Sequence, residues 1–278
     1  MGQGSFKRCA FFALLAFFLT MVFDCRAIAL PNDPKIPDTC RKWRGNVRWD
    51  ISECIAIIEG RRHTENLLDL VSAYFFRGQY FRILNRKAEA IADFSSALLI
   101  RPRFSLAQAW RGMVWKELDN CELAYPDLVA GVRGNPRYES LLIDAAICAY
   151  KLKKFENAIE LSRAAIVQNR RNPVPRMNLA STYLAMGSLR EALKAYDEAL
   201  ARPVRIEQPD ISRVHVQKGI IYIALNELEL ALQSYTRAIQ HDPNNRNAYI
   251  RRAYLHAHMG RNELAEADLM SANRTSAK

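Results

Sequence analysis

One spacing of small residues recurs along most of the chain. Alanine occupies positions 90, 124, 158 and 192 at equal intervals, a slightly longer interval leads to Ala231, and the original interval then leads to Ala265. Small residues also stand twelve positions before each alanine, at Gly78, Gly112, Ala146, Ala180, Gly219 and Ala253, and seven positions after it, at Ala97, Gly131, Ala165, Ala199, Ala238 and Ala272. Helix backbones approach closely only where side chains are short. The spacing therefore predicts two helices pressed together in each unit.

Large side chains and prolines complete the unit. Aromatic residues stand nine positions before most of the alanines or four positions after them, at Phe81, Trp115, Tyr183, Tyr222, Phe94, Tyr196 and Tyr235. Prolines follow the expected second helix at Pro102, Pro136, Pro203 and Pro243, and proline cannot continue a helix. The third unit departs most from the pattern, because Leu142, Ala149 and Ser162 replace large packing residues and Arg170 replaces the proline.

The pattern resembles that of the tetratricopeptide repeat over residues 71–278. This resemblance implies an all-α fold, in which tetratricopeptide helical hairpins stack in a right-handed superhelical solenoid and share one core. The expected units are 71–104, 105–138, 139–172, 173–211, 212–245 and 246–278. The fourth carries five extra residues within 200–212, where a longer exposed loop is expected.

The start of the chain has the pattern of a targeting segment. Lys7 and Arg8 precede an uninterrupted apolar run at 9–23, and Ala27-Ile28-Ala29 fits the small-x-small cleavage pattern. Residues 1–29 are therefore interpreted as a signal peptide for the Sec route, cleaved after Ala29. The alternative is a retained anchor, which is disfavoured because the run is shorter than the roughly 20 apolar residues that a spanning helix needs.

Residues 30–70 are interpreted as an N-terminal arm followed by a capping helix. Three prolines in 30–38 indicate an extended arm, whereas Ile51, Cys54, Ile55 and Ile58 fall on one face of a helix. The arrangement of Cys40, Asp50 and Cys54-Ile55 ahead of the repeats resembles the N-terminal segment of exported alphaproteobacterial tetratricopeptide proteins. That resemblance implies a bacterial protein of the periplasm.

Four cysteines follow the signal segment, an even number in a chain interpreted as exported. Cys40 and Cys54 lie outside the repeats, and we predict a disulfide between them. Cys121 and Cys148 come from neighbouring units whose helix ends should meet. For these two, a second bridge and a pair of buried thiols both remain open, and the thiols are the favoured alternative.

The sequence carries no motif that indicates catalysis. It lacks G-x-G-x-x-G, a Walker phosphate loop, G-x-S-x-G, H-E-x-x-H and any C-x-x-C pair. His256 and His258 are two positions apart on a helix and face different directions, which disfavours a metal site. We therefore expect no enzyme, no cofactor and no metal, and the scattered basic residues do not indicate a nucleic-acid partner.

The family resemblance assigns positions 2, 5, 9, 12 and 13 of each unit to the concave groove. The residues predicted to bind a peptide there are Phe75, Gln79, Met113, Ile143, Ile147, Tyr150, Met177, Val216, Ile220, Ile223, Ile250 and Tyr254, with Arg82 beside them. This lining is mostly apolar, so a peptide or an amphipathic helix of a cell-envelope protein is the expected partner. The alternative is that these side chains pack against neighbouring helices or the N-terminal arm. The acidic-tail clamp known from the family is not expected, because Met113, Ile143 and Met177 occupy one of its positions.

Two other functions remain as alternatives to a binding scaffold. Leu264, Leu269 and Met270 on the last helix suggest a self-associating structural protein of the envelope. A regulatory part of an envelope enzyme is the other. The basic clusters Lys151, Lys153 and Lys154, and Arg170 and Arg171, are interpreted as solvated helix ends, with docking to an anionic surface as the alternative.

Overall fold

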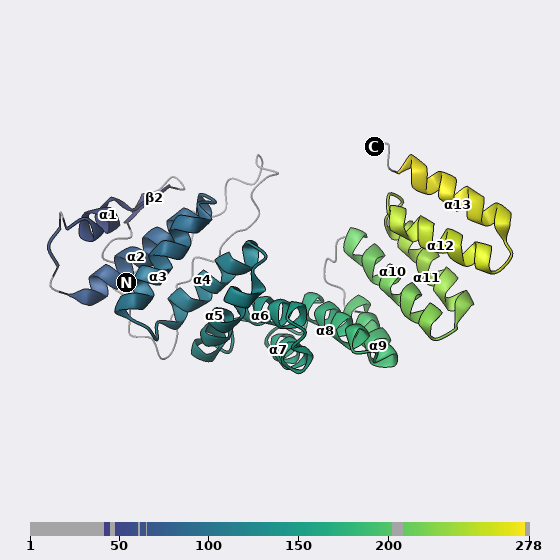
Figure 1. Ribbon diagram of the computed structural model, residues 1–278, viewed down its shortest axis with the longest axis horizontal. Helices are drawn as coiled ribbons and strands as arrows, with labels where there is room; N and C mark the ends of the chain where they lie inside the picture. The colour runs from purple at the N-terminus through teal and green to yellow at the C-terminus, as the bar shows by residue number, and fades with distance from the viewer. Residues whose placement is uncertain (1–41, 45–47, 61, 65, 202–207, 276–278) are drawn as a thin grey trace, which may run out of the picture. The chain divides into compact units, whose positions relative to one another are not determined.

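A computed structural model describes residues 42–44, 48–60, 62–64, 66–201 and 208–275 (Figure 1). Two short antiparallel strands come first, β1 (Lys42–Arg44) and β2 (Arg48–Asp50), with Lys42 opposite Asp50. The pattern of residues 30–70 predicts an extended arm and a helix, and it does not indicate these strands. The helix α1 (Ser52–Ile58) follows, buries Cys54 and Ile57, and packs against the next helix.

In the described part of the chain, twelve further helices follow in six pairs. The first helix of each pair, called the A helix from here on, is α2 (Leu67–Ile83), α4 (Ser105–Glu117), α6 (Glu139–Lys151), α8 (Val174–Ala185), α10 (Gln208–Ala224) or α12 (Arg246–His258). The second, called the B helix, is α3 (Lys87–Ile100), α5 (Cys121–Gly134), α7 (Phe155–Gln168), α9 (Leu189–Leu200), α11 (Leu228–His241) or α13 (Asn262–Arg274).

The pairs form a continuous stack. Each A helix makes its most extensive contact with the B helix of its own pair, and each B helix from α3 to α11 then contacts the following A helix. Figure 1 shows the paired helices following one another along the chain. The expected fold class, an all-α solenoid of helical hairpins, is confirmed. Pro102, Pro136 and Pro243 each stand two positions after the end of a B helix, as their role as helix stops requires.

The turn between the two helices of every pair has the same backbone conformation. The second residue after each A helix lies in the left-handed region, at Asn85, Asp119, Lys153, Gly187, Asn226 and Gly260, with φ between 57° and 77°. These positions repeat with the same intervals as the alanines. Glycine adopts this conformation without a steric penalty. The sequence pattern indicates the turn only at Gly187 and Gly260, whereas the backbone shows it in all six pairs.

Close approach of the two helices explains the small residues. Five of the six register alanines are fully buried, and Ala265 is nearly so. A Cβ atom added at Gly112 would lie only 2.9 Å from the backbone nitrogen of Leu128 in the partner helix. The side chains around these points form a series of buried clusters along the stack, rather than one central core.

The extra residues of the fourth unit do not all form a loop. α9 ends at Leu200 and α10 already begins at Gln208, four positions before the expected start of the fifth unit. The chain over 202–207 lies outside the described residues. Part of the added length within 200–212 therefore belongs to helix α10, and the longer exposed loop expected there stays a prediction. α2 likewise begins at Leu67, ahead of the expected start at residue 71.

Candidate functional site

The exposed surface of the A helices, called the A-helix face, is the place where the predicted site residues come together. α2 contacts α4, α4 contacts α6 and α6 contacts α8, so that neighbouring A helices are in contact over this part of the stack. Residues at positions 5, 9 and 12 of successive units therefore follow one another across the face, because each unit repeats the register of the last.

Nine of the twelve predicted site residues keep exposed surface. Tyr150, Ile223 and Tyr254 are 38%, 42% and 71% exposed, which makes them the most accessible of the set. The other six are half-buried, namely Met113, Ile143, Ile147, Met177, Ile220 and Ile250. Each of these side chains is therefore partly packed and partly accessible. Such partial exposure is suited to apolar contact with a second molecule.

Three of the predicted residues are buried within the protein itself. Phe75 is 3% exposed, and its ring centroid lies 5.1 Å from that of Phe104 and 6.0 Å from that of Phe94. Val216 and Gln79 are 3% and 8% exposed. Their side chains serve the packing of the array in this structure. For these three residues, the structure therefore agrees with the alternative interpretation, in which the predicted groove residues pack against neighbouring helices.

Ion pairs occupy the A-helix face over the first three units. Arg82 of α2 pairs with Glu117 of α4 at 2.5 Å, and Lys116 of α4 pairs with Asp144 of α6 at 2.5 Å. Burial raises the pKa of the Asp144 carboxyl, and its ion pair with Lys116 opposes that shift. The charges here are matched within the protein, so this part of the face is less open to a ligand than the part that follows.

A cavity opens on the A-helix face between the third, fourth and fifth units. It encloses about 310 Å³ and is lined from α6 by Tyr150, from α8 by Met177, Ser181, Leu184 and Ala185, from α9 by Tyr196, and from α10 by Arg213, Val214 and Gln217. Its volume is at the lower end of the range for ligand pockets in proteins, roughly 300 to 1,000 Å³.

The polar groups inside the cavity are partly paired with one another. The hydroxyl oxygens of Ser181 and Tyr196 lie 3.1 Å apart, within hydrogen-bonding distance. Burial raises the pKa of the Tyr196 hydroxyl, while its bond to Ser181 opposes the shift. The tyrosine therefore stays protonated at neutral pH, and the inner wall of the cavity carries no charge.

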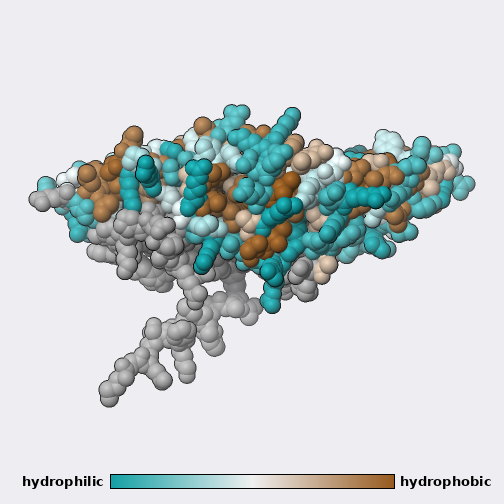
Figure 2. Space-filling view, turned by 90° about the horizontal axis from the view of Figure 1, so that it is seen from below, coloured by the Kyte–Doolittle hydropathy of each residue, from teal (hydrophilic) through white to brown (hydrophobic). Residues whose placement is uncertain are grey.

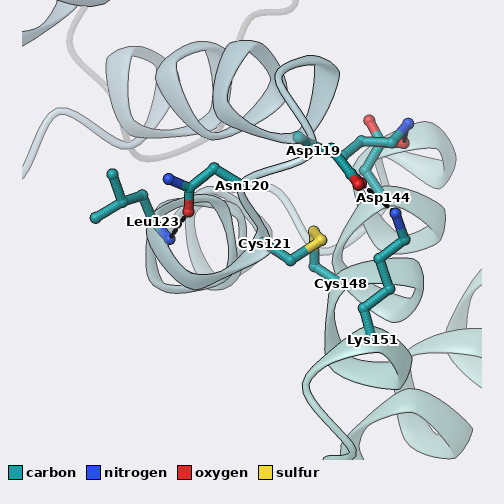
Figure 3. The surroundings of a disulfide bond; sticks show 8 residues. Asp119, Asn120, Cys121, Leu123, Asp144, Cys148 and Lys151 are labelled. Carbon is teal, nitrogen blue, oxygen red and sulfur yellow. Dashed lines mark hydrogen bonds and ion pairs between the residues drawn. A yellow bond between two sulfur atoms is a disulfide. The ribbon is translucent and has the colours of Figure 1, made fainter.

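A disulfide joins Cys121 at the start of α5 to Cys148 in α6 (Figure 3). Their Cα atoms are 5.0 Å apart, so the second helix of one unit is linked to the first helix of the next. The sequence favoured two buried thiols, and this expectation is wrong for the structure. Both side chains are buried, as the sequence suggested, but stacking brings them close enough to bond.

Polar contacts surround this bridge. In Figure 3, Asp119 and Lys151 form an ion pair across the same two units, and the Asn120 side chain accepts a hydrogen bond from the backbone nitrogen of Leu123 at 3.1 Å. Cys54 is fully buried in α1, but Cys40 lies outside the described residues, so the disulfide expected between them stays a prediction.

The described residues hold no cluster of three or more His, Cys, Asp or Glu side chains that could bind a metal ion. His215 and His241 stack with ring centroids 5.4 Å apart, and burial lowers the pKa of His215 to about 4.

None of the helices in the described part of the chain combines the length and the hydrophobicity needed to cross a membrane.

Apolar side chains are also exposed away from the A helices. Figure 2 shows hydrophobic residues gathered in several groups among hydrophilic ones on one face of the molecule. Leu99 of α3 is 84% exposed and Val167 of α7 is 66% exposed. Single exposed apolar residues are normal on protein surfaces. The A-helix face differs because its apolar residues share one register over five units, and two of them, Tyr150 and Met177, border a cavity.

Comparison with protein-family models identifies the type of repeat in two parts of the chain. Two models described as tetratricopeptide repeat match the chain, one at 71–104 and the other at 177–246 and 216–272. The matched segments, 71–104 and 177–272, are tetratricopeptide repeats. Among curated proteins, the chain is 25% identical over 171 residues to Hsp70-Hsp90 organizing protein 1 of Glycine max, and the aligned segment covers 59% of this chain and 29% of that protein. A stretch of 96 residues is 26% identical to Hsp70-Hsp90 organizing protein 2 of Arabidopsis thaliana, covering 34% of this chain and 16% of the relative. The chain thus spans less than a third of the length of these relatives.

Solved structures share the fold at low identity. The protein YrrB matches with a TM-score of 0.60 and 18% identity, covering 70% of this chain and 95% of YrrB. PilF of Pseudomonas aeruginosa matches with a TM-score of 0.56 and 18% identity, covering 73% of this chain and 90% of that protein. Identities this low establish the tetratricopeptide repeat fold alone.

The repeat register could have found some of the cavity residues that the sequence analysis missed. Ser181 and Leu184 stand one regular repeat interval after Ile147 and Tyr150, so they occupy the same two positions of the next tetratricopeptide repeat. Arg213 holds the second position of the fifth unit, which also belongs to the groove register. Tyr196 comes from a B helix, and no spacing signal indicates that its hydroxyl reaches the A-helix face.

Proposed function

We propose that this tetratricopeptide repeat protein is an exported, non-catalytic scaffold that binds a peptide or helix of a cell-envelope protein on its A-helix face. One observation carries the proposal. Nine apolar or aromatic side chains in a single register remain partly exposed across α4, α6, α8, α10 and α12. A surface of this kind contributes most when a few central residues are fully covered by a partner.

Other findings agree with a binding role. Tetratricopeptide repeat proteins act in protein–protein interaction and peptide binding, and the solved structure of YrrB is described as having an unusual peptide-binding site. The curated relatives are named as organizing proteins for Hsp70 and Hsp90. The cell-envelope partner and the periplasmic location are supported by the signal-peptide pattern of residues 1–29 and by the resemblance around Cys40 and Cys54.

The test replaces Ile147 and Tyr150 together by aspartate and compares the proteins captured from an envelope extract with those captured by the wild type. Unpaired carboxylates facing an apolar ligand are costly, so the double variant should lose its captured proteins while circular dichroism stays helical. The control is Ala158→Asp, which should unfold the array because Ala158 is fully buried between helices. Full capture by the double variant would overturn the proposed groove, as would unfolding as severe as that of the control. Cell fractionation tests the location separately.

Self-association through the last helix is the second candidate, because Leu269 and Met270 of α13 are 43% and 64% exposed. Leu264 of the same helix is 51% exposed. Glu266 and Asn273 stand one regular repeat interval after Leu232 and Ile239, which pack inside the stack. Polar residues at these two positions disfavour the stacking of a further helix on α13 in the way that α12 stacks on α11. Sedimentation separates the two functions, because a scaffold that acts alone should remain a monomer without its partner.

A further inference from the structure

The cavity on the A-helix face is lined mainly by apolar side chains, and its two hydroxyl groups are hydrogen-bonded to each other. Met177, Leu184 and Val214 contribute aliphatic surface, and Tyr150 contributes an aromatic ring. The hydroxyl groups of Ser181 and Tyr196 are paired with each other, so they do not require a polar ligand atom. A site built in this way accepts an apolar or aromatic side chain, because the two hydroxyl groups that such a side chain would desolvate already have a partner. The amide of Gln217 is the other uncharged polar side chain of the lining.

The rim of the cavity carries one positive charge. Among the described residues that line it, Arg213 is the only charged one. Its side chain is 74% exposed and pairs with Asp210 one helical turn before it, an exposed contact of the kind that contributes little free energy. The guanidinium group has donors beyond those needed for one carboxylate. It can therefore bind a second carboxylate, supplied by a ligand.

The position of the cavity coincides with the irregular step in the repeat. The contact between α9 and α10 is the least extensive of the contacts between successive pairs in the described part of the chain. This is the joint with the longest interval between register alanines, from Ala192 to Ala231. The cavity is lined from both sides of that joint, by Tyr196 of α9 and Val214 of α10. The inserted residues thus lie at the same joint as the cavity.

We propose that this cavity is the anchoring pocket of the groove, and that it takes one large apolar or aromatic side chain of a partner segment whose neighbouring carboxylate pairs with Arg213. The proposal rests on the proposed binding function and adds the chemistry of the ligand. Charge complementarity argues for the acidic group, because the only charge on the described lining of the pocket is positive. The chain also stays strongly positive, at +9, after removal of residues 1–29 with Lys7, Arg8, Arg26 and Asp24. The apolar lining argues for the side chain.

The test begins with selection of random peptides of about 12 residues, displayed on phage, against the intact protein. The selected peptides should carry an aromatic or large aliphatic residue within a few positions of Asp or Glu. The most enriched peptide is then synthesised, together with a version whose carboxylates are replaced by amides. Binding of both peptides is measured to the wild type and to Ala185→Trp, Arg213→Glu and Arg213→Gln.

Each variant tests one part of the site. Ala185 is exposed at the end of α8 and lines the cavity, so the tryptophan should fill it and abolish detectable binding. Arg213→Glu should weaken binding of the acidic peptide about tenfold, and added salt should weaken wild-type binding. Arg213→Gln should make the acidic and amide peptides bind alike. The matched control is Arg190→Glu on α9, an exposed arginine away from the cavity, which should bind as the wild type does.

The outcomes separate this proposal from the proposed function. If the wild type selects no peptide, the binding function itself is overturned. If it selects peptides that bind Ala185→Trp as well as the wild type, the groove function survives and the pocket is wrong. If the peptides lack carboxylates, or if Arg213→Glu binds them with unchanged affinity, the role of Arg213 is overturned. Arg213 is exposed, so its variants keep the test valid even where Ala185→Trp does not fold.

Discussion

Arg111 of α4 binds Asp127 of α5 through two parallel hydrogen bonds, 2.7 Å from Nε and 2.9 Å from Nη2. The same pairing, also with two bonds, joins Arg77 to Asp93 in the first repeat and Arg252 to Asp268 in the last. The carboxylates are nearly buried in all three. An ion pair in a fixed place between the two helices therefore accompanies the small residues that bring those helices together.

Replacing Asp127 by asparagine should lower the free energy of unfolding by about 2 kcal/mol, because an amide cannot accept both bonds and leaves the half-buried guanidinium of Arg111 poorly paired. Urea denaturation measures the change. The control is Asp119→Asn, whose carboxylate pairs with Lys151 but is 79% exposed, and this variant should stay within about 0.5 kcal/mol of the wild type. Equal effects in the two variants would contradict a special role for the Arg111–Asp127 pair.

The middle repeats show why the sequence predicts this fold but not all of its parts. Ala145 and Leu161 occupy the places of Arg111 and Asp127 in the third unit. The ion pair is thus lost there, while the small residues that define the helix contact remain. Helix pairing follows from a local spacing that every unit repeats, and the sequence therefore predicts it well.

Features that depend on the distance between two neighbouring units are harder to predict from the sequence. The bridge between Cys121 and Cys148 requires the helix ends of neighbouring units to meet at 5.0 Å, and a spacing of 27 residues does not determine that distance. The cavity at Tyr196 arises at the joint of irregular length between α9 and α10. The burial of Phe75 likewise depends on Phe94 and Phe104, which lie outside its own helix.

His215 should make the protein less stable in mild acid. Burial is the main cause of its low pKa, about 4, and the positive charges of Lys218, His241 and Arg237 lower the pKa further, while Asp197 raises it. Its Nδ1 atom has no hydrogen-bond partner among the described residues. An unfolded histidine has a pKa near 6.5, so the unfolded chain binds more protons than the folded one between about pH 6.5 and pH 4.

The contribution of neutral, buried His215 to the free energy of unfolding is therefore complete above about pH 6.5, and it is lost as the pH falls toward 4. At pH 5 the loss should be about 2 kcal/mol, since each unit between the pH and 6.5 costs about 1.4 kcal/mol. Urea denaturation at pH 7 and pH 5 measures it. The variant His215→Phe keeps an aromatic ring beside His241 and should show a smaller difference between the two pH values. The same difference in both proteins would rule out His215 as the cause.

Breaking the disulfide should weaken the array across the second and third units. A closed segment of 27 residues corresponds to about 3.5 kcal/mol in the chain-entropy model. The double variant Cys121→Ser, Cys148→Ser should lose about this much free energy of unfolding relative to the oxidised protein. Peptide mapping without reductant should find Cys121 linked to Cys148, and Cys40 linked to Cys54. Free thiols at Cys121 and Cys148 in protein purified under oxidising conditions would contradict the bridge, and free thiols at Cys40 and Cys54 would refute the other pairing.

Lys153 holds the left-handed turn position of the third repeat with φ of 58°, where a residue with a Cβ atom is disfavoured by roughly 1–2 kcal/mol. Lys153→Gly should therefore raise the free energy of unfolding by about 1 kcal/mol, after the larger chain entropy of glycine is subtracted. The reverse change, Gly187→Ala, should cost about 1 kcal/mol through the backbone alone, since no atom lies within 4 Å of the added Cβ. Lys153→Ala is the matched control, because it removes a charge beside Lys151 and Lys154 but keeps the Cβ atom. If the alanine variant gains as much stability as the glycine variant in urea denaturation, then repulsion among the lysines, and not the backbone conformation, is what destabilises this turn.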